Sequence, residues 1–131
     1  EMKRFNAHDG YGAIRAREHG LRLAVISGRQ TPIVDVRARE MQIDDVVQNA
    51  TDKVAAMEEL RRRYGLEVDE VAFIGDDLFD LPLLKAVGFS AAPSNSLRDV
   101  QKAVDYVTKA AGGYGAAREL IDLIIEYQSQ A

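Results

Sequence analysis

Short apolar runs alternate along the chain with longer stretches in which apolar side chains recur every three or four residues. The short runs predict buried strands, and the longer stretches predict amphipathic helices. The expected strands span residues 21–26, 45–47, 71–74, 89–92 and 106–107. The expected helices span about 32–41, 52–64, 77–87, 96–104 and 115–128. Strands and helices therefore alternate, with short connections between them.

Local signals at the helix ends agree with this pattern. Pro32 suits the first turn of the helix expected at 32–41. Thr51 or Asp52 is expected to cap the next helix. Ser96 is expected to cap a later helix. The run 61–63 of three arginines falls in a last turn, where the helix dipole favours cations.

Alternating strands and helices with short connections are typical of βαβ units, which build parallel sheets. We therefore expect an α/β fold with a doubly wound parallel sheet, helices on both of its faces, and a single domain over residues 1–131. Ligands of such sheets bind at the carboxyl ends of the strands. The turns of interest at those ends are residues 27–29, 51–53 and 75–77.

The composition is that of a globular protein and excludes several classes. The 131 residues are 47% hydrophobic and 29% charged. None is Cys, which excludes disulfides, a thiolate nucleophile and Cys metal sites. The formal net charge of −4 argues against a nucleic acid held by a basic face. The apolar runs fall far short of the roughly 20 residues that a membrane span requires, so we expect neither nucleic acid nor membrane as a partner.

Three carboxylates follow the apolar run at 71–74. Asp76 and Asp77 come directly after it, and Asp80 stands about one helical turn further on. Carboxylate oxygens are the hard ligands that Mg²⁺ prefers, so these residues are candidate metal ligands. The alternative is structural: Asp76 or Asp77 caps a helix, and Asp80 is a first-turn acid favoured by the dipole.

Two more polar residues stand at strand ends. Ser27 follows the first expected strand, where its hydroxyl and the next backbone N–H groups suit a phosphate oxygen, although Ser-Gly is also an ordinary turn. Lys53 begins a helix, where the dipole disfavours a cation. An anionic ligand would compensate for it, unless the side chain reaches into solvent. We expect the hydroxyl, the Lys and the carboxylates to meet at one edge of the sheet. Together they are the groups that phosphoryl transfer uses.

The order Ser27, Lys53 and Gly75-Asp76-Asp77-x-x-Asp80 resembles motifs two to four of the haloacid dehalogenase (HAD) superfamily of phosphatases. The resemblance extends to its small cap-less subfamily of octulosonate 8-phosphate phosphatases. It is carried by the stretches 5–12, 25–29, 71–84 and 112–119, and it covers essentially the whole chain. The resemblance implies a Rossmann-like phosphatase domain without a cap domain, with Mg²⁺ as cofactor. A phosphorylation-switch receiver domain carries similar residues, but its acidic pair precedes the hydroxyl and the Lys.

The resemblance implies catalytic and metal-binding roles at matching positions. Ser27, with Gly28 beside it, would bind the transferring phosphoryl group, and Lys53 would neutralise that group and the nucleophile. Asp76 would be a Mg²⁺ ligand, with Asp77 and Asp80 supporting the metal shell.

The resemblance also implies contacts with the substrate. Asp9 and Gly10 match the family's Asp-Gly pair near the substrate, and at the preceding His8 many relatives have Arg. Arg29 favours an octulosonate 8-phosphate, because related nonulosonate 9-phosphate phosphatases tend to carry Glu there. Arg37 is a second candidate for the sugar carboxylate, with a surface ion pair as the alternative.

One family feature is missing. These phosphatases carry an N-terminal strand ending in Asp-x-Asp-Gly, whose first Asp attacks phosphorus and whose second is the general acid/base. No Asp-x-Asp-Gly occurs in the chain. We therefore interpret the chain as an N-terminally incomplete HAD-like domain whose nucleophile lies upstream, and we expect no turnover from this polypeptide alone.

The implied function is Mg²⁺-dependent hydrolysis of 3-deoxy-D-manno-octulosonate 8-phosphate in the cytoplasm, a step toward lipopolysaccharide. The alternatives are a nonulosonate 9-phosphate phosphatase and a non-catalytic oligomerisation module of a sialic-acid cytidylyltransferase. The subfamily implies a homotetramer in which a neighbour supplies a lid. The apolar residues of 120–127 cover more than one helical stripe, which independently favours association. Residues 112–115 are expected to form a loop that closes on ligand. The alternative is a simple turn before the next helix.

Overall fold

The computed structural model describes residues 7–112 and 115–129, with the backbone only for residues 7–11. The helices are α1 (Ala7–Glu18), α2 (Pro32–Glu40), α3 (Lys53–Arg63), α4 (Leu81–Ala86), α5 (Arg98–Ala103) and α6 (Ala116–Ser129), with short 3-10 helices η1 (Val68–Glu70) and η2 (Leu78–Asp80). The strands are β1 (Ala24–Ile26), β2 (Asp45–Val47), β3 (Ala72–Ile74), β4 (Phe89–Ala92) and β5 (Tyr106–Val107). In this described part, no helix is long and apolar enough to cross a membrane.

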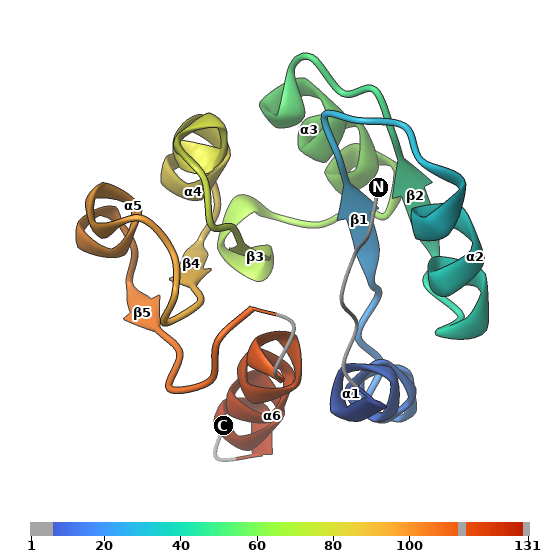
Figure 1. The fold of residues 1–131 in the computed structure, drawn as a ribbon. Helices are drawn as coiled ribbons and strands as arrows, with labels where there is room; N and C mark the ends of the chain where they lie inside the picture. The colour runs from blue at the N-terminus through green and yellow to red at the C-terminus, as the bar shows by residue number, and fades with distance from the viewer. Residues whose placement is uncertain (1–6, 113–114, 130–131) are drawn as a thin grey trace.

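The strands form two parallel sheets. β1 pairs with β2, and β4 lies between β3 and β5 in the second sheet. Figure 1 shows the two sheets side by side, with α1 and α6 together on one side of the strands and α3, α4 and α5 on the other. The α/β class, the parallel pairing and the helices on both sides are therefore confirmed.

The expected single sheet is interrupted between β1 and β3. Within the described residues, β1 pairs only with β2 and β3 pairs only with β4, so each has one edge that no strand pairs with. Their residues also stay partly exposed, whereas Ser90–Ala92 of β4 are buried. Inner strands of a parallel sheet are normally covered on both faces. β1 and β3 therefore leave an opening between the two sheets.

Two hydrophobic clusters hold the elements together. One joins α4, α5 and β4 through Leu84, Val100 and Ala92, with partly buried Phe73 of β3 against it. The other consists of Ala16, Ile121 and Ile125, with Leu21 and Leu23 packed against them. The first cluster supports the sheet that carries β3, and the second ties α6 to α1.

The contact between α1 and α6 depends on small residues of α1. Ala16 packs against Ile121 and Ile125, and a Cβ on Gly12 would lie 3.2 Å from the Cα of Arg118. The neighbouring Ala13 is buried as well. This packing changes the interpretation of the apolar C-terminal helix. Leu120, Ile121 and Ile125 are buried within the chain, and Tyr127 is the large apolar residue of α6 that stays exposed, at 75%. Most of the apolar surface expected to favour association is therefore covered by the protein's own fold.

The expected strands 45–47, 89–92 and 106–107 are observed with those bounds as β2, β4 and β5. The prediction for Ser96 is wrong: α5 has no side-chain cap, because its N-cap position is held by Leu97, and the Ser96 hydroxyl donates to the Pro93 carbonyl at 2.6 Å. The hydrophobic pattern predicts no range for helix α1, since its buried face is made of Ala and Gly rather than large apolar residues.

Candidate active site

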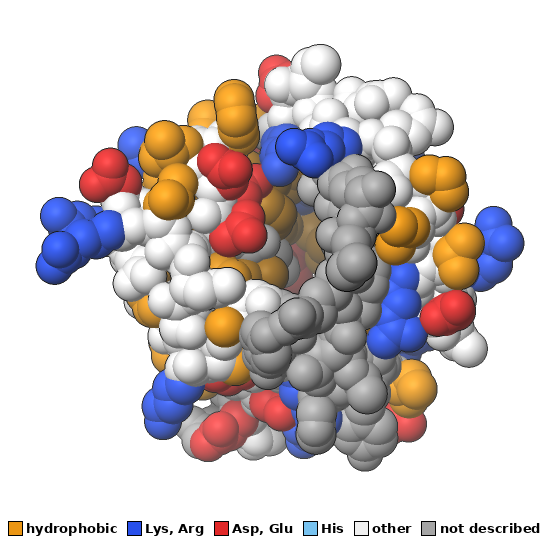
Figure 2. Space-filling view, in the orientation of Figure 1, with side chains coloured by type: hydrophobic (Ala, Val, Ile, Leu, Met, Phe, Trp, Pro, Cys, Tyr) orange, Lys and Arg blue, Asp and Glu red, His pale blue; other side chains and the backbone are white. Residues whose placement is uncertain are grey.

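A cavity of about 310 Å³ lies in the opening between β1 and β3. Figure 2 shows a hollow there, with hydrophobic side chains in its depth and acidic side chains on its rim. Residues from both sheets and from the C-terminal segment line it: Ile26, Ser27, Lys53, Phe73, Ile74, Gly75, Asp76, Asp80, Pro93, Gly112, Ala116 and Ala117. The hydroxyl, the Lys and two of the three carboxylates singled out in the sequence therefore meet in one cavity.

Lys53 and Asp80 form the central ion pair of the cavity. The Lys53 Nζ lies 2.6 Å from Oδ1 of Asp80, and the two side chains are only 20% and 6% exposed. Lys53 is the first residue of α3, behind Asp52, whose carboxylate caps the helix by accepting from the Ala55 N–H at 3.0 Å. Asp80 therefore compensates for the unfavourable charge of Lys53 at a helix N-terminus, and it fixes the ammonium group inside the cavity.

The other oxygen of Asp80 organises the loop after β3. Oδ2 accepts from the backbone N–H groups of Asp76 and Asp77, at 3.1 and 3.2 Å. Gly75 makes this closeness possible, since a Cβ there would lie 2.7 Å from the Cβ of Asp80. Asp77 caps η2 by accepting from the Leu78 N–H at 2.6 Å. The structural alternative for Asp77 and Asp80 is thus realised, while Asp76 is exposed and lines the cavity.

Ser27 is held where β1 ends. Its N–H donates to the Val47 carbonyl at 2.8 Å, and its own carbonyl accepts from the Ala50 N–H at 2.9 Å. These bonds tie the turn after β1 to the turn after β2. The Ser27 Oγ accepts from the Arg29 N–H at 3.2 Å, which leaves the hydroxyl proton to donate to a ligand in the cavity.

The other expected substrate residues lie away from this lining. Gly28 and Arg29 are exposed beside Ser27. Arg37 of α2 forms an ion pair with Glu40 at 3.0 Å, which is the surface pair considered as its alternative. The backbone of Asp9 and Gly10 belongs to the first turn of α1, and their side chains lie outside the described residues. Their substrate contacts stay predictions.

A metal ion has a partial set of ligands here. No group of three or more His, Asp or Glu residues that could hold a metal occurs among the residues that the structure describes. Asp80 is engaged by Lys53 and by two N–H groups, and Asp77 caps η2. Asp76 remains as a hard oxygen donor at the cavity, which fits Mg²⁺ if further oxygens come from outside the described residues.

The sequence pattern missed part of the cavity wall. Pro93 follows β4, and Gly112, Ala116 and Ala117 come from the segment around the start of α6. Small side chains give no chemical signal of their own. The expected loop at 112–115 did point to this region, and Gly112 at its start lines the cavity, while residues 113 and 114 lie outside the described part.

The chain matches a known family over most of its length. Residues 29–120 match the family of haloacid dehalogenase-like hydrolases, and the chain belongs to that family. Among individual relatives, the 3-deoxy-D-manno-octulosonate 8-phosphate phosphatase KdsC of Escherichia coli K12 is 35% identical over 130 residues, which are 99% of this chain and 69% of the relative. The Yersinia pestis enzyme of the same name is 36% identical, over 99% of this chain and 70% of its own length.

Solved structures give the same result. The 3-deoxy-D-manno-octulosonate 8-phosphate phosphatase of Moraxella catarrhalis, in complex with magnesium, phosphate and KDO, matches with a TM-score of 0.94 at 37% identity. The match covers 99% of this chain and 75% of that one. The cobalt-bound phosphatase of Haemophilus influenzae matches with a TM-score of 0.93 at 34% identity, over 98% of this chain and 75% of its own. The resemblance to HAD phosphatases inferred from the motifs is therefore confirmed.

Proposed function

We propose that this protein is a Mg²⁺-dependent phosphatase of sugar-acid phosphates, with 3-deoxy-D-manno-octulosonate 8-phosphate as its substrate. The observation that carries the proposal is that Ser27, Lys53 and Asp76 line one cavity at the carboxyl ends of β1 and β3. The named relatives act on that substrate, and the Moraxella catarrhalis structure holds magnesium, phosphate and KDO. The product would feed lipopolysaccharide synthesis in the cytoplasm.

The residues of the cavity have complementary tasks in phosphate binding. The Ser27 hydroxyl donates to one phosphoryl oxygen, and the Lys53 ammonium donates to another while Asp80 holds it in place. Asp76 would hold the metal, with Asp77 and Asp80 keeping its loop in position. Bound Mg²⁺ would neutralise negative charge on the phosphate as it is attacked. Catalysis of this kind rests on positioning and charge neutralisation.

The nucleophile is proposed to come from a strand upstream of this chain. Two observations support that source: among the described residues no strand pairs with the facing edges of β1 and β3, and the relatives are longer than this chain. A parallel strand between β1 and β3 would satisfy both edges and place its carboxyl end at Ser27, Lys53 and Asp76. Its first Asp would attack phosphorus, and the phosphate–sugar oxygen bond would break. The second Asp would protonate the leaving alkoxide, and water would then hydrolyse the aspartyl phosphate.

Arg29 supports the octulosonate over a nonulosonate substrate. It is exposed next to Ser27, close enough in sequence to reach a sugar carboxylate while Ser27 holds the phosphate. Gly28 between them leaves the turn open to the substrate, while Arg37, which pairs with Glu40, is a weaker candidate. Asp9 and Gly10 complete the proposed substrate set. The alternative of a non-catalytic module is disfavoured, because the Lys53–Asp80 pair has no need to face a cavity in such a module.

A homotetramer is proposed from the family resemblance. Leu78 and Phe79 give it support: these neighbouring large apolar side chains lie between Asp76 and Asp80 in the sequence and are 49% and 84% exposed. Light scattering of the purified protein measures the subunit number, and a monomer would contradict this part of the proposal.

Kinetics of Lys53→Ala test the function. In the polypeptide that includes the upstream strand, this change should lower kcat/KM for the octulosonate 8-phosphate by about 100-fold or more. Arg62→Ala, at the other end of α3 with a side chain 75% exposed, is the matched control and should stay within about twofold of the unaltered protein. A nonulosonate 9-phosphate is assayed in parallel. Equal effects of the two substitutions, or a preference for the nonulosonate, would contradict the assignment.

A further inference from the structure

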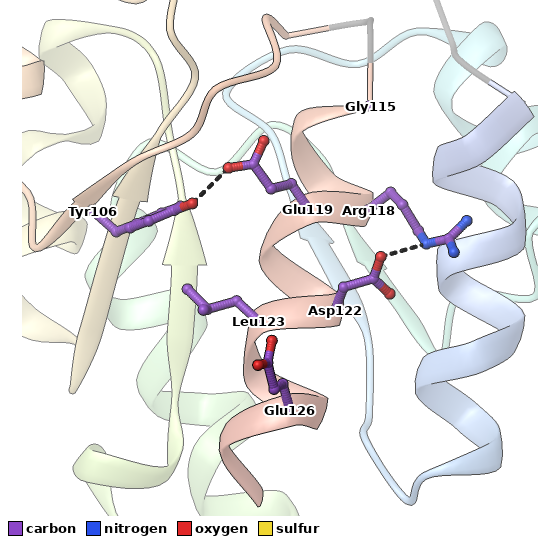
Figure 3. Close-up of a pocket in the computed structure, with 7 residues that line it drawn as sticks. All are labelled: Tyr106, Gly115, Arg118, Glu119, Asp122, Leu123 and Glu126. Atoms are coloured by element: carbon purple, nitrogen blue, oxygen red, sulfur yellow. Dashed lines mark hydrogen bonds and ion pairs between the residues drawn. The ribbon is translucent and has the colours of Figure 1, made fainter.

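Glu119, in the first turn of α6, accepts hydrogen bonds from three groups outside the cavity lining. Its carboxylate accepts from the Tyr106 hydroxyl at 2.6 Å and from the Lys109 N–H at 2.9 Å. It also accepts from the Ala110 N–H at 3.0 Å. Figure 3 shows the Glu119 carboxylate turned toward Tyr106, across the space between α6 and β5. One side chain thus joins a helix, a strand and the backbone that follows the strand.

The backbone held by Glu119 leads directly to the cavity. Residues 108–112 leave β5, and Gly112 at their end lines the cavity together with Pro93. The opposite side of this segment is attached to the end of β4: the Thr108 N–H donates to the Ala92 carbonyl at 2.9 Å, and the Gly112 N–H donates to Asn95 Oδ1 at 2.9 Å. Segment 108–112 is therefore clamped between Asn95 on one side and Glu119 on the other.

The contacts of the clamp suit a carboxylate. All three groups that face Glu119 are donors, two backbone N–H groups and one hydroxyl, and a carboxylate is an acceptor only. Burial by itself would raise the pKa of Glu119, but the hydrogen bonds from Tyr106 and the two N–H groups outweigh it, so that the pKa lies below its ordinary value. The Tyr106 pKa is raised by the same hydrogen bond. The interaction therefore stabilises an ionised Glu119.

We propose that Glu119 is a positioning residue: by holding segment 108–112 it fixes the wall of the cavity formed by Gly112 and the start of α6, and so sets the affinity for the phosphorylated substrate. Glu119 does not line the cavity, and it acts through the backbone that does. This inference rests on the proposed function for its effect on substrate, but the clamp itself is independent of that function.

Glu119→Gln tests the proposal with little change of shape: both carboxylate oxygens of Glu119 accept hydrogen bonds, and the amide keeps only one of these acceptors and carries no charge. Tyr106→Phe removes one hydrogen bond and gives a milder second variant. Glu126→Gln is the matched control: the residue lies two turns along α6 and is exposed. Glu119 and Glu126 both line the pocket drawn in Figure 3, which is separate from the cavity with Ser27 and Lys53. All three are made in the polypeptide that includes the upstream strand.

Amide hydrogen exchange is the first readout. Glu119→Gln should speed exchange in residues 109–112 by about tenfold or more, Tyr106→Phe by less, and Glu126→Gln hardly at all. Steady-state kinetics are the second readout: Glu119→Gln should raise KM several-fold and leave kcat within about twofold, because no group that touches the reacting atoms has changed.

Each outcome bears on the clamp or on its role. Exchange no faster in Glu119→Gln than in Glu126→Gln overturns the proposal. Faster exchange with an unchanged KM also overturns it, since Glu119 would then be merely structural. If the unaltered protein hydrolyses no sugar phosphate, the proposed function fails separately. The affinity for inorganic phosphate, measured by calorimetry, then replaces KM, and it should fall in Glu119→Gln but not in Glu126→Gln.

Discussion

Replacing Asp80 by Asn should reveal how much the Lys53–Asp80 pair contributes to stability. Asn has the same shape, and its one oxygen can still accept from the Asp76 and Asp77 N–H groups, so the loss falls on the pair with Lys53. Removing one partner of a buried pair costs about 3–5 kcal/mol. Because Lys53 keeps 20% of its side chain exposed and can turn toward solvent, we expect about 2–3 kcal/mol.

Urea unfolding followed by circular dichroism measures this loss. With an m value of about 2 kcal/mol/M, the unfolding midpoint should fall by about 1–1.5 M. Asp99→Asn, at an exposed acid in the first turn of α5, is the matched control and should change stability by about 0.5 kcal/mol or less.

A double-mutant cycle decides whether the loss belongs to the ion pair. In a Lys53→Met background, Asp80→Asn should lower the free energy of unfolding by about 2 kcal/mol less than in the unaltered chain. The reason is that the Lys53 ammonium group, which Asp80→Asn would leave without its partner, is already absent. If Asp80→Asn costs the same in both backgrounds, the two side chains are not coupled and the reasoning is refuted.

The remaining predictions concern packing, pH and metal. Gly12→Ala should lower the melting temperature by about 4 °C, because overpacking against the Arg118 Cα outweighs the gain in helix propensity; a higher melting temperature would contradict the close packing of α1 on α6. The pKa of Glu119 is lowered in the folded protein, so its stabilisation is present above about pH 4.5 and is lost as pH falls further. The difference in free energy of unfolding between the unaltered protein and Glu119→Gln should therefore shrink as the pH falls from 6 to 3. A difference that stays constant would contradict a stabilising role of the ionised Glu119. Chelation by EDTA should lower phosphatase activity of the longer polypeptide by about 100-fold or more, with recovery on adding Mg²⁺; activity that resists EDTA would argue against the metal.

The strands were predicted well because their signal is local. Three of them match the expected bounds, since a short run of mostly apolar residues between turns defines both ends of a strand. Helix α1 gives no such signal: its buried face is Ala13 and Ala16 beside Gly12, and their burial depends on how closely α6 approaches. Tertiary packing of small residues is invisible to a pattern of hydrophobic positions.

The candidate site was predicted in outline but not in its internal contacts. The position of Lys53 at a helix N-terminus led us to expect an anionic ligand or solvent around its ammonium group, whereas its partner in the structure is the carboxylate of Asp80. The same holds for Glu119, whose contacts with Lys109 and Ala110 join parts of the chain that only the folded protein brings together. Residue types at strand ends predict where functional side chains lie, whereas their hydrogen-bond partners depend on tertiary structure.

The most direct test of the central claim compares two polypeptides. One is the 131-residue chain, and the other also includes the upstream strand proposed above to carry the nucleophile. Release of inorganic phosphate from 3-deoxy-D-manno-octulosonate 8-phosphate is measured for both with Mg²⁺. The account predicts turnover by the longer polypeptide and none by the chain alone. Turnover by the purified 131-residue chain, or none by the longer polypeptide, would contradict it.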